Sequence, residues 1–236
     1  MTESNHENNV IESVHAPAVL QDSVHSEAVL DRPAFNRRQM EVFDRASAFF
    51  ASEEAVPNDA LERLYKLLSL GLAERDRLSE TRFLDVGAGC GVLTGLLLEI
   101  NPGARVTAVD LSKKMLDVLR GRFPGVQTVA DDVLSLSSPS AYDSIWINAC
   151  YGNLYDPGAV IRHLAGQMSY GASLHISHPM GRGFQGRLHE KDPLTVPHAL
   201  PASRKEADEL FAGSGLDFVR LVDQEQAYLL SYRLNK

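Results

Sequence analysis

The segment RFLDVGAGCG, residues 82–91, decides the fold of this chain. Its first half, Arg82–Val86, predicts a short buried strand, because an apolar run stops abruptly at a glycine. Its second half carries three glycines, which let a ligand approach the backbone closely. The apolar run Val92–Ile100 that follows predicts a helix, whose first turn would offer unpaired N–H groups to a ligand. The segment therefore predicts a strand, a ligand-binding turn and a helix in succession.

Strand-like and helix-like segments alternate along the chain after this segment. Further strands are expected over 105–109, 126–130, 143–148 and 172–177. Helices are expected between them, one capped by Ser112 and one over 157–168. Short connections between such segments predict crossover units, and hence a mostly parallel sheet covered by helices on both faces.

The two ends of the chain depart from this alternation. Apolar residues that recur every three or four positions predict helices from Pro33 to Phe50 and from Asn58-Asp59 onward. We expect these helices to cap the core. Near the other end, a helix from Arg204 to about Gly213 leads into strands over 217–223 and 227–234. So short a link between these strands predicts an antiparallel hairpin. The expected fold is a seven-stranded, doubly wound α/β sheet whose final strand is antiparallel.

The chain is predicted to form one domain behind an acidic tail. Residues 1–32 are expected to be a flexible tail, residues 33–80 a helical cap, and residues 81–236 the core with a substrate loop at 178–205. The first thirty residues contain five acidic residues and no Lys or Arg. A small helical element is the alternative for this tail. Its three histidines are spaced too widely to share one helix face, so no metal site is expected.

Composition excludes several classes of protein. No apolar run approaches the ~18 residues that a membrane span needs. Two cysteines are too few for a disulfide scaffold, and no secretory signal pattern is visible, so we expect a cytoplasmic protein. The net charge of −8 is unfavourable for binding nucleic acid, but the chain after residue 30 carries only −3 of it.

The spacing of the glycines separates two kinds of ligand. A dinucleotide-binding loop, G-x-G-x-x-G, would need a glycine where this chain has Val92. The spacing here is G-x-G-x-G, with Asp85 two residues before Gly87, and Asp110 ends the next strand. This combination resembles the class I S-adenosylmethionine-dependent methyltransferases, which have a Rossmann-like fold. The resemblance runs from about Arg82 to the chain end and weakens after Ser177.

The resemblance implies a role for each matching residue. The glycine loop would wrap the amino acid part of S-adenosylmethionine, and Asp110 would hold its ribose. Leu111 and Met115 would line the adenine, with core packing as the alternative. Asp132, or alternatively Asp131, would accept from the adenine amino group, and the Val133 N–H would meet a ring nitrogen. The predicted cofactor-binding residues are Asp85, Gly87, Gly89, Gly91, Asp110, Leu111, Met115, Asp132, Val133 and Asn148.

The methyl acceptor is expected beyond the carboxyl ends of the fourth and fifth strands. Tyr151 and His178 are the predicted catalytic residues there. Tyr151 would order the substrate by a hydrogen bond or form a wall of the site. His178 would be a general base, with a structural role in the turn before Pro179 as the alternative. His175 lies within a strand and is expected to be a core histidine.

The segment 178–205 is the least family-like part of the chain. It carries a net charge of +3 and four prolines, and long connections of this kind are often functional. One hypothesis is that it closes over the substrate together with the helix 35–50, in which case Arg182 and Arg187 would suit an anionic acceptor. The alternative is a solvated connector whose charges balance nearby acids.

These observations predict an S-adenosylmethionine-dependent methyltransferase that acts on a small molecule. A methyltransferase acting on RNA or protein is the second hypothesis, although no appended binding domain is visible. A cofactor-binding partner subunit without catalytic activity is a third. The acceptor atom is left open, because this fold serves many acceptors.

Overall fold

The computed structural model describes residues 30–52, 55–77, 80–139 and 141–235. Seven strands form one mixed sheet in the order β3-β2-β1-β4-β5-β7-β6. The strands are β1 (Arg82–Val86), β2 (Arg105–Asp110), β3 (Gln127–Ala130), β4 (Tyr142–Asn148), β5 (Met168–His178), β6 (Leu216–Gln224) and β7 (Ala227–Leu234). The first five strands pair in parallel, and β7 lies antiparallel between β5 and β6. The predicted fold class is confirmed.

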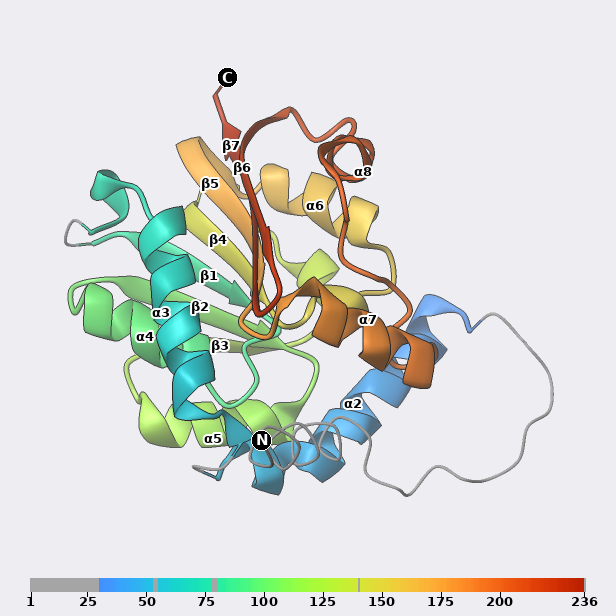
Figure 1. The fold of residues 1–236 in the computed structure, drawn as a ribbon. Helices are drawn as coiled ribbons and strands as arrows, with labels where there is room; N and C mark the ends of the chain where they lie inside the picture. The colour runs from blue at the N-terminus through green and yellow to red at the C-terminus, as the bar shows by residue number, and fades with distance from the viewer. Residues whose placement is uncertain (1–29, 53–54, 78–79, 140, 236) are drawn as a thin grey trace, which may run out of the picture.

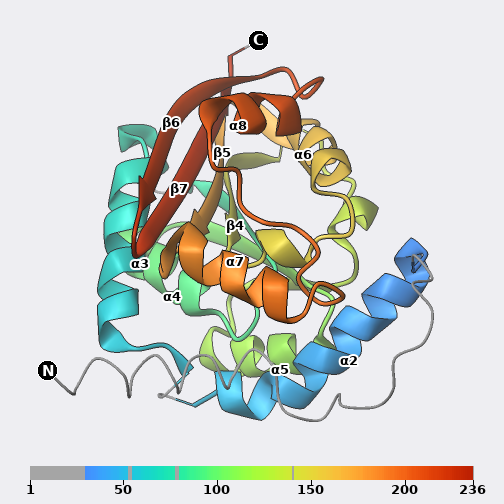
Figure 2. The same cartoon turned by 45° about the vertical axis from the view of Figure 1, so that its right-hand side comes forward.

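Helices cover both faces of this sheet (Figures 1 and 2). On one face lie α3 (Asn58–Gly71), α4 (Val92–Ile100) and α5 (Lys113–Arg122), and on the other α6 (Pro157–Ala165) and α8 (Arg204–Leu210). Successive residues of one strand serve the two layers: Phe83 packs with the α3–α5 side and Leu84 with the α6–α8 side. Apolar residues on both faces explain why the strands read as continuous hydrophobic runs rather than as alternating ones.

The predicted cap 33–80 divides into two parts. The helix α2 (Arg32–Phe50) is capped by Asp31, whose carboxylate accepts the Ala34 N–H. It packs against α5 (Figure 2). The helix α3 instead buries Leu64, Leu67 and Leu68 against the sheet, so it belongs to one of the two helical layers. A 3₁₀ turn, η2 (Glu74–Arg77), leads from it to β1. Residues 1–29, most of the expected tail, lie outside the described residues.

Two predicted boundaries are wrong. The helix expected to reach Met168 stops at Ala165, because Gly166 caps it. Met168 is already the first residue of β5, where it pairs with Tyr142 of β4. The segment 178–205 is not a loop throughout, because it contains the helix α7 (Gly181–Lys191). Its prolines suggested an irregular connection, but Pro179 precedes this helix and the other three follow it. Within the described residues, no helix has the length and hydropathy that a membrane crossing requires.

Candidate active site

A cavity of about 260 Å³ lies at the carboxyl ends of the central strands. Two groups of residues surround it. The cofactor side consists of the turn after β1, the end of β2 and the loop after β3. The acceptor side consists of the ends of β4 and β5, the start of α7, and parts of α2 and α3. This is the place where a doubly wound sheet binds its ligands.

The glycine turn approaches the cavity through its backbone. Gly87 and Gly89 both line it, and both have positive φ angles, 66° and 52°. A Cβ atom on Gly87 would collide with the Cys150 side chain. The Cβ position of Gly89 has no heavy atom within 4 Å, so open space lies beside this backbone. Glycine is therefore required at both positions, once for packing and conformation and once for conformation alone.

The carboxylate of Asp110 holds this turn against the end of β2. Its Oδ2 accepts the Gly89 N–H at 2.9 Å, and its Oδ1 accepts the Ser112 N–H at 2.8 Å. Burial raises the pKa of Asp110, and the two N–H groups oppose that rise. Leu111 and Met115 line the cavity beside it, and Met115 is also 98% buried in the packing of α5. Met115 thus packs in the core and also lines the cavity, and its contact with adenine stays a prediction.

Two predicted cofactor-binding residues do not line the cavity. Asp85 is buried behind the turn, where it accepts a 2.7 Å hydrogen bond from Thr94 in α4, and burial raises its pKa to about 7. Gly91 has a φ of 89°, and a Cβ there would lie 2.9 Å from the Leu119 side chain of α5. Both residues position the turn and the start of α4 rather than face the ligand space.

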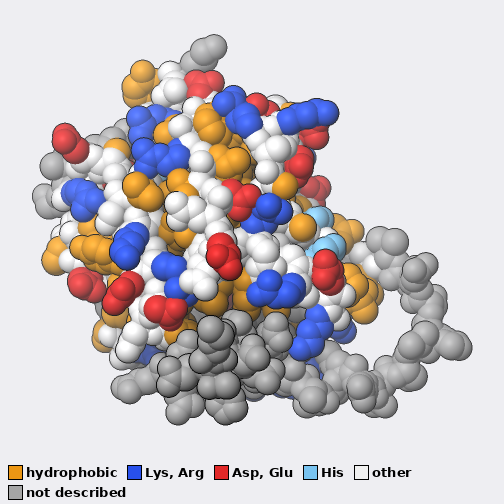
Figure 3. Space-filling view, viewed as in Figure 1, with side chains coloured by type: hydrophobic (Ala, Val, Ile, Leu, Met, Phe, Trp, Pro, Cys, Tyr) orange, Lys and Arg blue, Asp and Glu red, His pale blue; other side chains and the backbone are white. Residues whose placement is uncertain are grey.

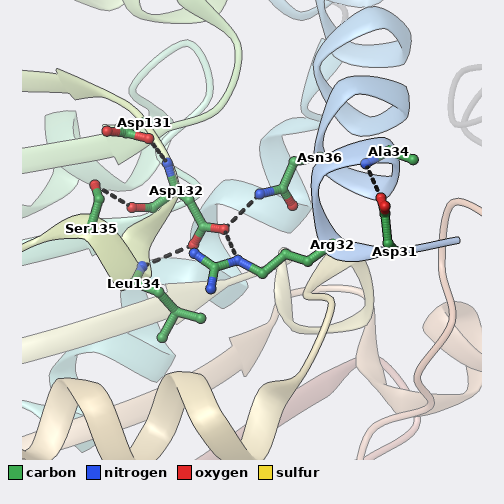
Figure 4. A network of polar contacts seen from close by, with 8 residues as sticks. All are labelled: Asp31, Arg32, Ala34, Asn36, Asp131, Asp132, Leu134 and Ser135. Atoms are coloured by element: carbon green, nitrogen blue, oxygen red, sulfur yellow. Dashed lines mark hydrogen bonds and ion pairs between the residues drawn. The ribbon is translucent and has the colours of Figure 1, made fainter.

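Asp132 joins the cofactor side to α2, as Figure 4 shows. Its Oδ1 accepts the Leu134 N–H at 2.9 Å, and its Oδ2 accepts from Asn36 at 2.6 Å and from Arg32 at 2.8 Å. Burial alone would raise the pKa of Asp132, but these donors lower it below the ordinary value. Asp131, the alternative acid, accepts the Asp132 N–H. Asp131, Asp132 and Val133 all line the cavity.

On the acceptor side, the structure brings Asn148 and His178 to the cavity. Asn148 accepts a 2.8 Å hydrogen bond from Ser177, and the next residue, Ala149, has an uncommon positive φ of 51°. The Nδ1 of His178 accepts the Met180 N–H at 3.1 Å. A backbone N–H can only donate, so the neutral ring carries its proton on Nε2. This bond supports the structural role of His178 in the turn before Pro179, and its general-base role stays a prediction.

The structure places Tyr151 in the core rather than in the cavity. It begins the 3₁₀ turn η4 (Tyr151–Asn153), is 6% exposed, packs edge-on against His198, and burial raises its pKa to about 12. We therefore assign it a packing role.

His175 is a core histidine, as expected: it stacks on Trp146 with ring centroids 4.1 Å apart, and burial lowers its pKa to about 3. Cys150 lines the cavity, and burial raises the pKa of its thiol.

The segment 178–205 forms part of the cavity wall, but its charged side chains do not line the cavity. His178, Pro179, Met180 and Phe184 line the cavity. Arg182 instead pairs with Asp223 at 2.7 Å, and Arg187 lies over the Phe184 ring. Neither arginine is part of the lining. The pairing of Arg182 matches the alternative in which the charges of this segment balance nearby acids.

Sequence reasoning missed most of the residues that α2 and α3 contribute to the cavity. Among them are Asn36, Gln39, Phe43, Phe50 and Ala60. Gln39 carried a usable signal, because a glutamine inside the apolar stripe of a helix is unusual unless it has a partner. Nothing in the local pattern indicated which edge of the sheet α2 would cover. The described residues contain no group of three His, Cys, Asp or Glu side chains suited to a metal ion.

Comparison with known proteins agrees with this geometry. Residues 83–169 match the model of a methyltransferase domain. The chain is 31% identical over 156 residues to a ubiquinone biosynthesis O-methyltransferase of Xylella fastidiosa, covering 62% of each chain. It is 32% identical over 118 residues to a malonyl-[acyl-carrier protein] O-methyltransferase of Acetivibrio thermocellus, covering 48% of this chain and 42% of that one. The matched parts thus span about half of these relatives.

A solved structure shares the fold at low identity. The N-methyltransferase NodS of Bradyrhizobium japonicum, in complex with S-adenosyl-L-homocysteine, superposes with a TM-score of 0.61 at 16% identity and covers 83% of this chain and 97% of its own. The glycine turn and the Asp110 carboxylate both lie within residues 83–169, the part that the domain model matches. Residues 83–169 thus match a methyltransferase domain, and the chain shares the fold of a solved methyltransferase.

Proposed function

We propose that this protein transfers a methyl group from S-adenosylmethionine to a small-molecule acceptor. The observation that carries the proposal is the cavity itself. Its cofactor side, with the glycine turn and the Asp110 carboxylate, faces a largely apolar acceptor side. The names of the two relatives above support an oxygen acceptor. Basic and acidic side chains are interspersed over the face shown in Figure 3, which favours a small molecule over RNA. The two free cysteines accord with a cytoplasmic location.

The residues on the cofactor side fit S-adenosylmethionine. Gly89 leaves open space beside the backbone, which suits a ligand that lies against the turn. The Asp110 oxygens keep lone pairs beyond those used by Gly89 and Ser112, so they suit ribose hydroxyls. Apolar side chains and a carboxylate border the expected adenine position. We assign these contacts to Gly87, Gly89, Asp110, Leu111, Met115, Asp132 and Val133, and a further contact to Asn148 from the acceptor side.

Bound S-adenosylmethionine supplies a methyl group on a positively charged sulfur. The chain has to orient the acceptor in line with that carbon and exclude water, and little further chemistry is required of it. In transfer to a hydroxyl, the cofactor would supply the methyl group and keep the bonding electron pair, and the acceptor's proton would pass to solvent as the product is released. His178 lines this side of the cavity, and its Nδ1 accepts the Met180 N–H.

Calorimetric titration with S-adenosylmethionine tests the cofactor site. Replacing Asp110 with Ala removes the acceptor of two N–H groups, so we expect the Kd to rise about a hundredfold, as for a charged hydrogen-bonding group. Asp117→Ala, an exposed acid of α5, is the matched control and should leave the Kd unchanged. Equal affinities for wild type and Asp110→Ala would show that the ribose lies elsewhere.

Incubation with labelled S-adenosylmethionine and a cell extract tests the acceptor class. Label in small metabolites is expected. Label recovered in RNA or protein would contradict the small-molecule assignment while leaving the methyltransferase assignment intact. Binding of the cofactor without any labelled product would instead support a partner subunit without catalytic activity.

A further inference from the structure

Two side-chain amides from distant elements meet at one backbone carbonyl. The Gln39 Nε2 of α2 donates to the Thr195 carbonyl at 2.7 Å, and the Asn153 Nδ2 of η4 donates to the same oxygen at 2.9 Å. A carbonyl oxygen only accepts, so both amides must present their nitrogens to it. Their own oxygens are consequently the atoms left for other partners. Gln39 and Asn153 both line the cavity.

The oxygen of Gln39 lacks a partner within the described chain. Gln39 is 2% exposed, and its Oε1 is buried without a hydrogen bond. Buried acceptors are almost always paired in folded proteins, so an unpaired one in the wall of a ligand cavity points to a bound partner. That partner must carry a hydrogen to donate.

Most of the rest of the acceptor side is apolar, and neither Lys nor Arg lines it within the described residues. Aromatic and aliphatic side chains from α2, the segment before α3, the residue after η4 and the start of α7 form most of its wall: Phe43, Phe50, Val56, Leu154, Met180 and Phe184. Among the described residues, the cavity lining contains four aspartates and neither Lys nor Arg. A carboxylate would therefore lose water without gaining a cation, which disfavours it strongly.

We propose that Gln39 and Asn153 form the acceptor subsite, and that they bind a neutral hydrogen-bond donor, a hydroxyl or an amine, on an apolar molecule. This inference rests on the proposed methyltransferase function and specifies its substrate class. The amide oxygen accepts the acceptor's O–H or N–H as a hydrogen bond and orients the nucleophilic atom. Thr195 is the anchor that holds both amides in this orientation.

Three probes that share one ring system test the substrate class: 2-naphthol, 2-naphthylamine and 2-naphthoic acid. Methyl transfer from labelled S-adenosylmethionine is measured with the full chain, and kcat and KM are determined separately. We expect turnover of the naphthol or the amine, and a slower reaction or none with the acid. Faster methylation of the acid would overturn the proposal.

Variants test the residues. Gln39→Leu should raise the KM of the hydroxyl or amine probe about tenfold, while kcat changes less than about threefold. Asn153→Ala, on another element, should raise the same KM and serves if Gln39→Leu does not fold. The matched control is Arg38→Ala, because Arg38 also ties α2 to Thr195, at 3.4 Å through the hydroxyl, but does not line the cavity. Its KM should stay within about twofold of wild type.

The outcomes separate this proposal from the proposed function. An equal rise in KM for Arg38→Ala and Gln39→Leu would show that Gln39 only fastens the segment around Thr195, and would overturn the subsite. So would an unchanged KM in Gln39→Leu, or the absence of product from all three probes while S-adenosylmethionine binds. Failure of the wild-type chain to bind S-adenosylmethionine would overturn the proposed function, and the subsite with it.

Discussion

The two sides of the cavity are built in different ways. The cofactor side comes from residues 86–134, nearly all of it from three successive connections between strands and helices. Backbone N–H groups and short carboxylates dominate it, and they bond mostly to neighbours nearby in the chain, while Asp132 also accepts from Arg32 and Asn36 of α2. The acceptor side combines residues 36–64, 148–160 and 178–184, and Gln39 reaches its partner Thr195 across 156 positions. One side is therefore local and the other depends on tertiary contacts.

This difference teaches where substitutions should act. On the cofactor side, backbone conformation carries the geometry, so a single added methyl group can disrupt the site. On the acceptor side, side chains from several elements share the task, so single replacements should shift affinity for one ligand and leave the fold intact. Three experiments test this contrast, beginning with the largest expected effect.

Gly87→Ala should have the largest effect. The new Cβ would collide with Cys150, and the φ of 66° is unfavourable for alanine. We expect a loss of S-adenosylmethionine affinity of at least about a hundredfold, or a loss of stability of a few kcal/mol. Calorimetry and thermal unfolding measure the two. Gly121→Ala is the matched control, because its Cβ position in α5 has no heavy atom within 4 Å and the change should be neutral or stabilising. Equal behaviour of the two variants would contradict a backbone-built cofactor side.

The two halves of the sheet should respond oppositely to pH. Asp85 in β1 has a pKa of about 7 in the folded chain against 3.8 ordinarily, so the folded state keeps a proton that the unfolded state releases. Its contribution to stability is present at low pH and is lost as pH rises from about 4 to 7. His175 in β5 has a pKa of about 3 against 6.5, so the unfolded state gains a proton that the folded state refuses. Its contribution is lost as pH falls below about 6.5.

Urea unfolding of Asp85→Asn and His175→Gln at pH 7 and pH 5 separates these contributions. Relative to His175→Gln, the wild type should lose about 2 kcal/mol of its free energy of unfolding between pH 7 and pH 5. Relative to Asp85→Asn, it should gain a similar amount over the same range, about 2 kcal/mol. Each variant is the control for the other. Parallel pH curves for the wild type and both variants would show that neither group titrates differently on folding.

Arg32→Ala should have the smallest effect. Arg32 and Asn36 fasten α2 to Asp132, but the Arg32 side chain is 42% exposed, so water replaces part of what is lost. We expect the Kd of S-adenosylmethionine to rise about threefold, with no change in the fold. Arg37→Ala, an exposed neighbour on the same helix, should leave the Kd unchanged. A rise as large as that for Gly87→Ala would mean that α2 is an essential part of the cofactor side.

The sequence by itself determined the cofactor half of this protein. Strand β1, helix α4 and the Ser112 cap were predictable because hydrophobic periodicity, glycine and capping chemistry act within a few residues. The hairpin of β6 and β7 followed from a connection too short for a crossover. The assignments of Asp110, Gly87 and Gly89 to the ligand side rest on the same local chemistry, and the structure places all three at the cavity.

Only the tertiary structure decided the acceptor half. It placed Tyr151 in the core and joined His178 to the Met180 N–H. It also introduced α7, and it joined Gln39 to Asn153 through Thr195. Each of these outcomes depends on which distant segments pack together. Local sequence patterns hold no information about that choice, because the partners are brought together by burial of apolar surface across the whole domain.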